Sequence, residues 1–143
     1  MKDPSNKVSQ AVYALLNNNV TVSGITWPVY QVVPDSVDTG YVYIGDFQYT
    51  DDSTKDRFLS SCNLQVQVVN YQLDQGGSAK FFKDMVSKVQ ELINPTVTST
   101  LDLSPTFNNT YLYTQNVIDA GGFFPNGNEQ RAVITFNLEI EQL

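Results

Sequence analysis

The chain has 143 residues, 41% of them hydrophobic and 16% charged, a composition typical of one folded domain spanning residues 1–143. Its 15 acidic and 8 basic residues give a net charge of −7, which disfavours a phosphate-binding basic surface. The absence of histidine excludes serine–histidine and cysteine–histidine catalysis and histidine-based metal sites. The single cysteine, Cys62, excludes an intramolecular disulfide.

The first predicted element is a helix near the N-terminus. Asp3 followed by Pro4 is typical of a helix start, with Asp3 as the N-cap and proline in the first helical position. Apolar residues then recur at helical spacing until the asparagines at 17–19 end the helix. The apolar stripe consists of Val8, Ala11, Val12, Leu15 and Leu16.

A long hairpin is predicted next. Short β-branched and aromatic runs between residues 20 and 33 are interrupted by prolines, which predicts short or edge strands. Residues 41–49 and 58–72 have clear strand character, the second with alternating apolar and amide side chains. The eight residues between them, 50–57, are all polar and five are charged, so we expect a charged tip that projects from the protein.

A second helix is predicted to begin after Gly76-Gly77-Ser78, which offers an N-cap, and to end at Asn94-Pro95 because proline cannot continue a helix. Its apolar stripe is Phe82, Met85, Val86, Val89, Leu92 and Ile93.

The C-terminal third is predicted to contain a hairpin. Residues 96–110 have no clear period and predict a long connection with at most one short strand. Residues 111–118 predict a strand, 119–128 a turn-rich loop, and 131–143 a final strand that alternates with little error. The whole order predicts an α+β fold, with two helices packed on one face of a mostly antiparallel sheet.

The sequence contains no clear catalytic, metal-binding or phosphate-binding motif. Asp51, Asp52 and Asp56 lack the alternating ligand spacing of a calcium loop, and residues 76–80 lack the phosphate-loop pattern. Cys62 has no histidine partner, so a half-buried strand thiol is favoured over a nucleophile. We therefore predict a non-enzymatic protein with no catalytic residue, metal site or cofactor.

Tyrosine is unusually abundant for a small domain, with eight residues. The interior of such a domain does not readily accommodate so many, and tyrosine is favoured at protein interfaces. The aromatic residues of the 41–49 strand are predicted to share one face; they are Tyr41, Tyr43, Phe47 and Tyr49. The candidate interface aromatics are Tyr43, Tyr49, Tyr111 and Tyr113.

Several segments together carry a family resemblance. They are AVYALL (11–16), VYQVVP (29–34), YVYIG (41–45), LQVQVV (64–69) and GGS (76–78), which opens the second helix before a final hairpin. In this order the chain resembles the tail-completion or tail-terminator proteins of tailed bacteriophages, most clearly over residues 8–93. It departs from their pattern in the 94–110 connection and in the longer charged tip.

The resemblance implies a structural virion protein that forms a homo-oligomeric ring of 6 or 12 copies at the head–tail junction or tail end. Its partners would be itself, portal or adaptor proteins, and tail-tube or tail-hub proteins. Phage double-stranded DNA would pass through the lumen without sequence-specific binding. An acidic lumen suits this role because it repels the phosphate backbone. Assembly is expected in the host cytoplasm, without a membrane.

Two groups of charged residues acquire candidate roles in such a ring. The acidic pair Glu139 and Glu141 shares a polar strand face and is the candidate lumen face. The hairpin tip carries opposite charges on a projecting arm and is the candidate contact with a neighbouring subunit or ring. Its candidate residues are Asp51, Asp52, Lys55, Asp56 and Arg57.

Three alternatives remain open from the sequence. The first is a neck or connector ring attached to the portal. The second is a monomeric module that binds carbohydrate or protein through its tyrosines. The third is a carboxylate-dependent enzyme, which needs a cleft holding two acids whose pKa values are separated.

Overall fold

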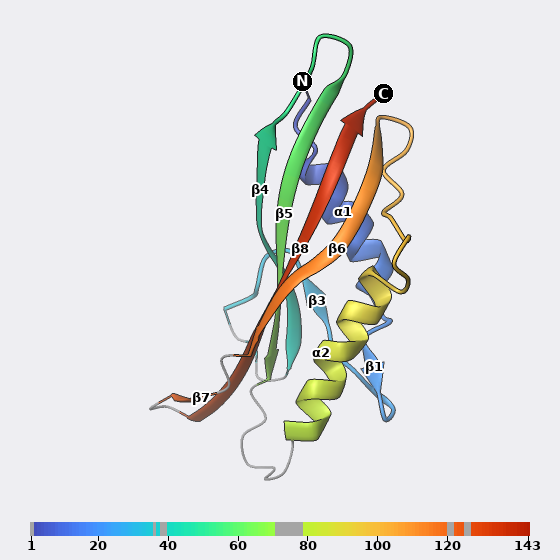
Figure 1. Ribbon diagram of the computed structural model, residues 1–143. Helices are drawn as coiled ribbons and strands as arrows, with labels where there is room; N and C mark the ends of the chain where they lie inside the picture. Colours follow the sequence, from blue (N-terminus) through green and yellow to red (C-terminus); the bar gives the residue numbers. More distant parts are fainter. Residues whose placement is uncertain (1, 36, 38–39, 71–78, 120–121, 125–126) are drawn as a thin grey trace.

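The computed structural model describes residues 2–35, 37, 40–70, 79–119, 122–124 and 127–143 (Figure 1). The predicted α+β class is confirmed. The helices are α1 (Ser5–Leu16) and α2 (Ala79–Ile93). The strands are β1 (Thr21–Val22), β2 (Ile25–Thr26), β3 (Val29–Tyr30), β4 (Tyr41–Asp51), β5 (Phe58–Asn70), β6 (Phe107–Asp119), β7 (Gly122–Phe124) and β8 (Gly127–Gln142).

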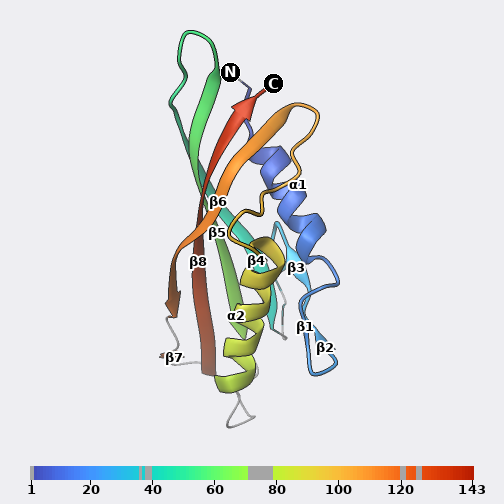
Figure 2. The same ribbon diagram turned by 45° about the vertical axis from the view of Figure 1, so that its right-hand side comes forward.

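The main sheet has the strand order β3-β4-β5-β8-β6, and β7 pairs with the beginning of β8. Only the β3–β4 pair is parallel; β4–β5, β5–β8 and β6–β8 are antiparallel. Both helices lie on the same side of this sheet, as predicted, and no described helix covers the other side (Figure 2). Neither described helix is long and apolar enough to cross a membrane.

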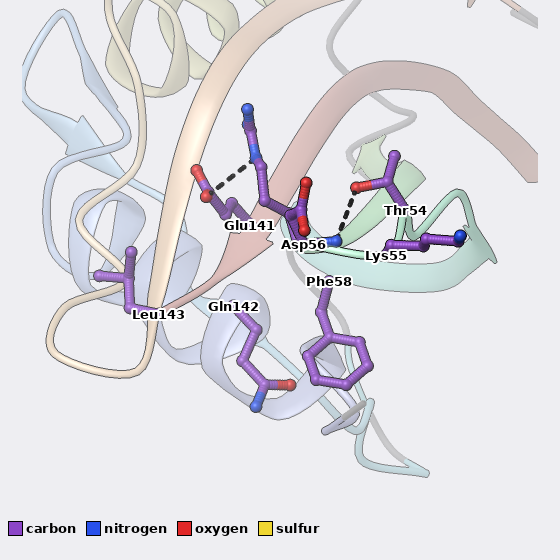
Figure 3. Close-up of a pocket in the computed structure, with 8 residues that line it drawn as sticks. Thr54, Lys55, Asp56, Phe58, Glu141, Gln142 and Leu143 are labelled. Carbon is purple, nitrogen blue, oxygen red and sulfur yellow. Dashed lines mark hydrogen bonds and ion pairs between the residues drawn. The ribbon is translucent and has the colours of Figure 1, made fainter.

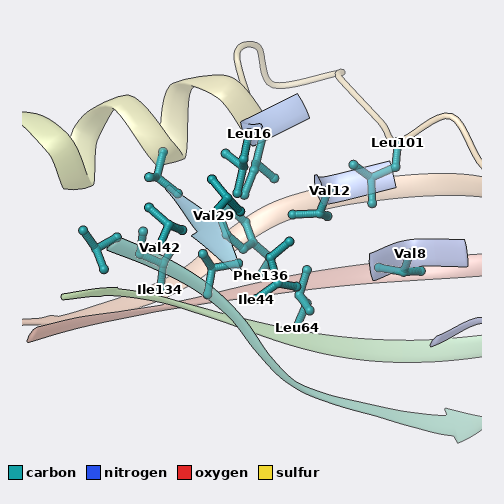
Figure 4. Packing of buried hydrophobic residues seen from close by; sticks show 14 of the residues in the cluster. Val8, Val12, Leu16, Val29, Val42, Ile44, Leu64, Leu101, Ile134 and Phe136 are labelled. Atoms are coloured by element: carbon teal, nitrogen blue, oxygen red, sulfur yellow. The ribbon is translucent and has the colours of Figure 1, made fainter. Parts of the chain in front are cut away.

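The core lies between the helices and the sheet (Figure 4). Along β8, alternate residues from Ala132 to Ile140 are buried, and β5 presents Leu64, Val66 and Val68 to the same side. Residues one turn apart in α1, namely Val8, Val12 and Leu16, face this surface. The period-two and helical patterns of the sequence therefore predict the core correctly.

The start of α1 differs slightly from the prediction. Pro4 occupies the N-cap position, and the Asp3 carboxylate accepts a hydrogen bond from the Ser5 N–H at 2.8 Å. Asp3, the residue before the N-cap, thus accepts a hydrogen bond from one of the free N–H groups at the helix start. Leu15 is exposed rather than buried, because the buried stripe of α1 is a single row of residues.

The C-terminal region departs more clearly from the prediction. Strand β6 begins at Phe107, so residues 107–110 belong to a strand and not to the connection. The connection itself inserts Leu101 and Leu103 into the core. The predicted 119–128 loop contains β7, which forms a short hairpin with β8. The predicted N-cap at residues 76–78 lies outside the described residues.

The prediction that the aromatic residues of β4 share one face is wrong. A β-bulge lies between Ile44 and Phe47, where three steps along β4 match two along β5. The extra residue reverses the alternation, as bulges do. Tyr43 therefore lies on the side opposite the helices, whereas Tyr49 pairs with the buried Cys62 and lies on the helix side.

Candidate functional site

The face of the sheet opposite the helices is the candidate functional surface, and we call it the uncovered face. Strand register assigns its residues, because side chains alternate between the two sides. It is lined by Tyr43, Gln48 and Thr50 of β4, Ser61, Asn63, Gln65 and Gln67 of β5, Tyr111, Tyr113, Asn116 and Ile118 of β6, and Val133, Thr135, Asn137, Glu139 and Glu141 of β8. Most of these side chains are uncharged hydrogen-bonding groups.

A stacked tyrosine pair occupies the β6 side of this face. The Tyr111 and Tyr113 rings are 5.8 Å apart between centroids, with an interplanar angle of 26°. Both rings are partly exposed, at 38% and 47%. Asn137 Nδ2 donates to the Tyr113 hydroxyl at 2.8 Å and fixes the second ring. Two of the predicted interface aromatics thus form a positioned aromatic platform.

The environment of Tyr111 keeps its hydroxyl protonated. Partial burial raises its pKa above the ordinary value of 10.0, and the nearby Glu139 carboxylate, Tyr113 and Asp52 raise it further because they oppose a negative phenolate. Tyr111 therefore remains a neutral hydrogen-bond donor throughout the physiological range.

The two predicted lumen acids share the uncovered face but have different partners. Glu139 accepts a hydrogen bond from Thr110 Oγ1 at 2.8 Å. Glu141 forms an ion pair with Arg57 Nε at 3.2 Å. Towards the other end of the face, Arg131 donates to Gln67 Oε1 at 2.7 Å. The negative charge of the uncovered face is therefore concentrated near the hairpin tip, where Arg57 partly neutralises Glu141.

The hairpin tip extends beyond the last β5–β8 pair, Phe58 with Gln142 (Figure 1). Its first two acids stabilise the turn itself. The Ser53 N–H donates to Asp51 Oδ1 at 2.9 Å, and the Ser53 hydroxyl also donates to it; these bonds lower the pKa of Asp51 below its ordinary value. The Ser61 hydroxyl donates to Asp52.

A surface pocket of about 310 Å³ lies between the tip and the C-terminus (Figure 3). It is lined by Thr54, Lys55, Asp56, Arg57, Phe58, Glu141, Gln142 and Leu143. The Arg57–Glu141 ion pair forms part of its wall, while the exposed Phe58 and Leu143 flank it. Of the five tip residues predicted as contacts, Lys55 and Asp56 are the central residues of the turn, which the Thr54 N–H closes by donating to the Arg57 oxygen at 2.9 Å. Neither has an ion pair among the described residues.

The architecture has a counterpart among solved structures. It is similar to a chain in the virion of native gene transfer agent (GTA) particle, with a TM-score of 0.63 and 18% sequence identity. The two share a fold. The alignment covers 96% of this chain and 90% of that chain, so the likeness extends over nearly the whole length of both. The sequence matches no protein-family model and no curated protein.

Cys62 lies on the helix side of this shared fold, and burial raises the pKa of its thiol from 9.0 to about 11. At a given pH near 8, it therefore carries about a hundredfold less thiolate than an ordinary cysteine. Alkylation by iodoacetamide is expected to be slowed at least that strongly in the native protein, with urea-unfolded protein as the control. Equal rates would contradict the burial of Cys62.

Burial of Cys62 also makes the stability of the fold depend on pH. Because the pKa of the thiol is raised in the folded state, its contribution to the free energy of unfolding is fully present below pH 9 and is lost as pH rises through 11.

Sequence reasoning missed several polar contacts of this site. Asn109 is buried, accepts from the Leu101 N–H at 2.8 Å, and donates to the backbone oxygens of Tyr111 and Glu139 at 2.7 and 2.9 Å. The Arg57–Glu141 pair joins segments far apart in the chain. The only signal for Asn109 was an asparagine in a polar stretch, a pattern that usually indicates a loop.

Proposed function

We propose that this protein is a structural subunit of a phage-like virion and that it forms a homo-oligomeric ring at the head–tail junction or tail end. The observation that carries the proposal is the shared fold with a virion chain over nearly the whole length of both chains. The chain acts as one domain in this proposal, since a single buried cluster includes residues from Val8 to Ile140. Its role is assembly and not catalysis.

The uncovered face supports this role physically. It offers amide, hydroxyl and tyrosine groups over four strands, a composition that suits contacts with another protein surface. In the described residues no group of three or more cysteine, aspartate or glutamate side chains is arranged to hold a metal ion.

The proposed ring encloses a lumen through which double-stranded DNA passes. The net charge of −7 favours sliding without adhesion, because like charges repel the phosphate backbone. Glu139 is a better candidate lumen residue than Glu141, since Glu141 is paired with Arg57. The proposed ring contains 6 or 12 copies of this protein. Its proposed neighbours are portal or adaptor proteins and tail-tube or tail-hub proteins.

A neck ring attached to the portal is the second candidate, because likeness to one chain of a whole virion fits either position. A monomeric module that binds carbohydrate is the third. The observation in its favour is the exposed, stacked Tyr111–Tyr113 pair, since sugar rings pack on aromatic faces. It differs from the ring proposals in requiring a stable monomer.

The hairpin tip is proposed to contact a neighbouring subunit or ring through Lys55 and Asp56. A charge-exchange variant, Lys55→Asp with Asp56→Lys, keeps the net charge but reverses the pattern of the tip. We expect light scattering to show a smaller mass than for the unmodified protein, because an interface charge placed opposite a like charge is repelled. The matched control is Lys83→Glu with Glu91→Lys, which exchanges the charges of two exposed residues of α2.

The outcomes separate the two parts of the proposal. An unchanged mass in the tip variant, with an oligomeric unmodified protein, would refute the role of the tip alone. A monomeric unmodified protein across a concentration series would refute the ring.

A further inference from the structure

Strand β6 is an open edge of the sheet. It ends the strand order, and β8 is its only strand partner among the described residues. Outside that pairing, the only backbone hydrogen bond of β6 to another described segment is from the Phe107 N–H to the Leu103 oxygen. An edge strand exposes a row of unpaired N–H and C=O groups, which is a template for another strand.

The sequence of β6 lacks the charged residues and prolines that often protect an edge. From Phe107 to Ile118 it has no charged residue and no proline. Four large hydrophobic side chains of this strand are exposed: Tyr111, Tyr113, Val117 and Ile118. Bulges at 109/111 and 114/116 divide the edge into three paired runs, and the exposed hydrophobic residues lie in the second and third of these runs. Such a strand is either covered in an assembly or prone to aggregation.

The opposite edge of the sheet is also open over part of its length. Strand β3 pairs with β4 only at Val42 and Tyr43, whereas β4 continues to Asp51. Residues 44–51 of β4 therefore have no described strand beside them on that edge, and Tyr49 is exposed there.

The two open edges lie at the same level along the strands and run in opposite directions. When the strand pairings are followed from β4 through β5 and β8 to β6, Ile44 lies level with Val117 and Asp51 lies level with Asn109. Three successive antiparallel pairings separate β4 from β6, so these two strands run in opposite directions. A second copy placed beside the first in the same orientation would therefore bring its β4 antiparallel to β6.

We infer that the subunits join edge to edge, with β6 of one copy paired antiparallel with residues 44–51 of β4 in the next copy. This inference rests on the proposed ring and specifies its contact. The two edges differ, so the contact is heterologous, which is the type that closes into a ring by rotation. Main-chain hydrogen bonds supply affinity, and the exposed β6 side chains fix the register.

Edge-blocking variants test the inference. Tyr113→Lys with Ile118→Lys places two lysines on the β6 edge, and Gln48→Lys with Tyr49→Lys does the same on the β4 edge. The matched control is Val97→Lys, an apolar-to-lysine change at a fully exposed position in the connection. Circular dichroism and thermal unfolding confirm that each variant folds, and analytical ultracentrifugation measures its mass.

We expect each edge-blocked variant to be monomeric alone, while Val97→Lys keeps the unmodified mass. Mixed in equal amounts, the two edge-blocked variants are expected to form a dimer and nothing larger, because each retains the edge that the other has lost. A β4-blocked variant that stays dimeric alone would instead indicate symmetric β6–β6 pairing and overturn the inference. Full-size oligomers from either blocked variant would also overturn it and leave the ring proposal standing. A monomeric unmodified protein would overturn both.

Discussion

Replacing Phe136 by alanine is expected to lower the free energy of unfolding by about 3–5 kcal/mol, the cost of truncating a fully buried aromatic side chain. Phe136 is 0% exposed and lies at the centre of β8, opposite Leu64 of β5 (Figure 4). The cavity left between sheet and helices closes only partially, because the surrounding core residues relax little around a truncated side chain. Urea unfolding followed by the fluorescence of the single tryptophan, the buried Trp27, measures the loss.

The matched control is Phe58→Ala, the same truncation at a residue that is 47% exposed at the base of the hairpin tip. Its expected cost is about 1 kcal/mol, since about half of the Phe58 surface is already in contact with water. Equal losses in the two variants would contradict the position of the core between the helices and β8.

Replacing Asn109 by alanine is expected to cost about 1–3 kcal/mol, because it leaves buried backbone groups without hydrogen-bond partners. The side chain of Asn109 is 4% exposed and holds three backbone groups together, from the connection, β6 and β8. The same urea titration measures the effect.

Asn108→Ala is the neighbouring control, since the Asn108 side chain is exposed. We expect a change within about 0.5 kcal/mol for this surface substitution. If Asn109→Ala were as mild as Asn108→Ala, the connection would not be fastened to the sheet through Asn109.

The elements that the sequence predicts best are those with one dominant period. Strand β8 alternates from Arg131 onward with few exceptions, and α2 has an apolar stripe from Phe82 to Ile93. In both cases burial on a single side is the main constraint on the sequence, so the pattern is direct evidence for the buried face. The same alternation places Glu139 and Glu141 on the uncovered face.

The features that sequence reasoning missed depend on contacts between distant segments. The bulge between Ile44 and Phe47 is defined only by the register with β5, and it moves Tyr49 to the helix side. The sequence pattern around Asn109 predicts a loop, and its structural role depends on the hydrogen bond from the distant Leu101 N–H. The open edges of β4 and β6 follow from strand order, which short-range periodicity does not encode.

The central claim is that this protein assembles into a ring with an open lumen. Negative-stain electron microscopy of the purified, unmodified chain tests it most directly, because class averages show both subunit arrangement and a central channel. We expect closed rings with a stain-filled centre. Isolated globular particles at every concentration, or open filaments without closure, would contradict the account.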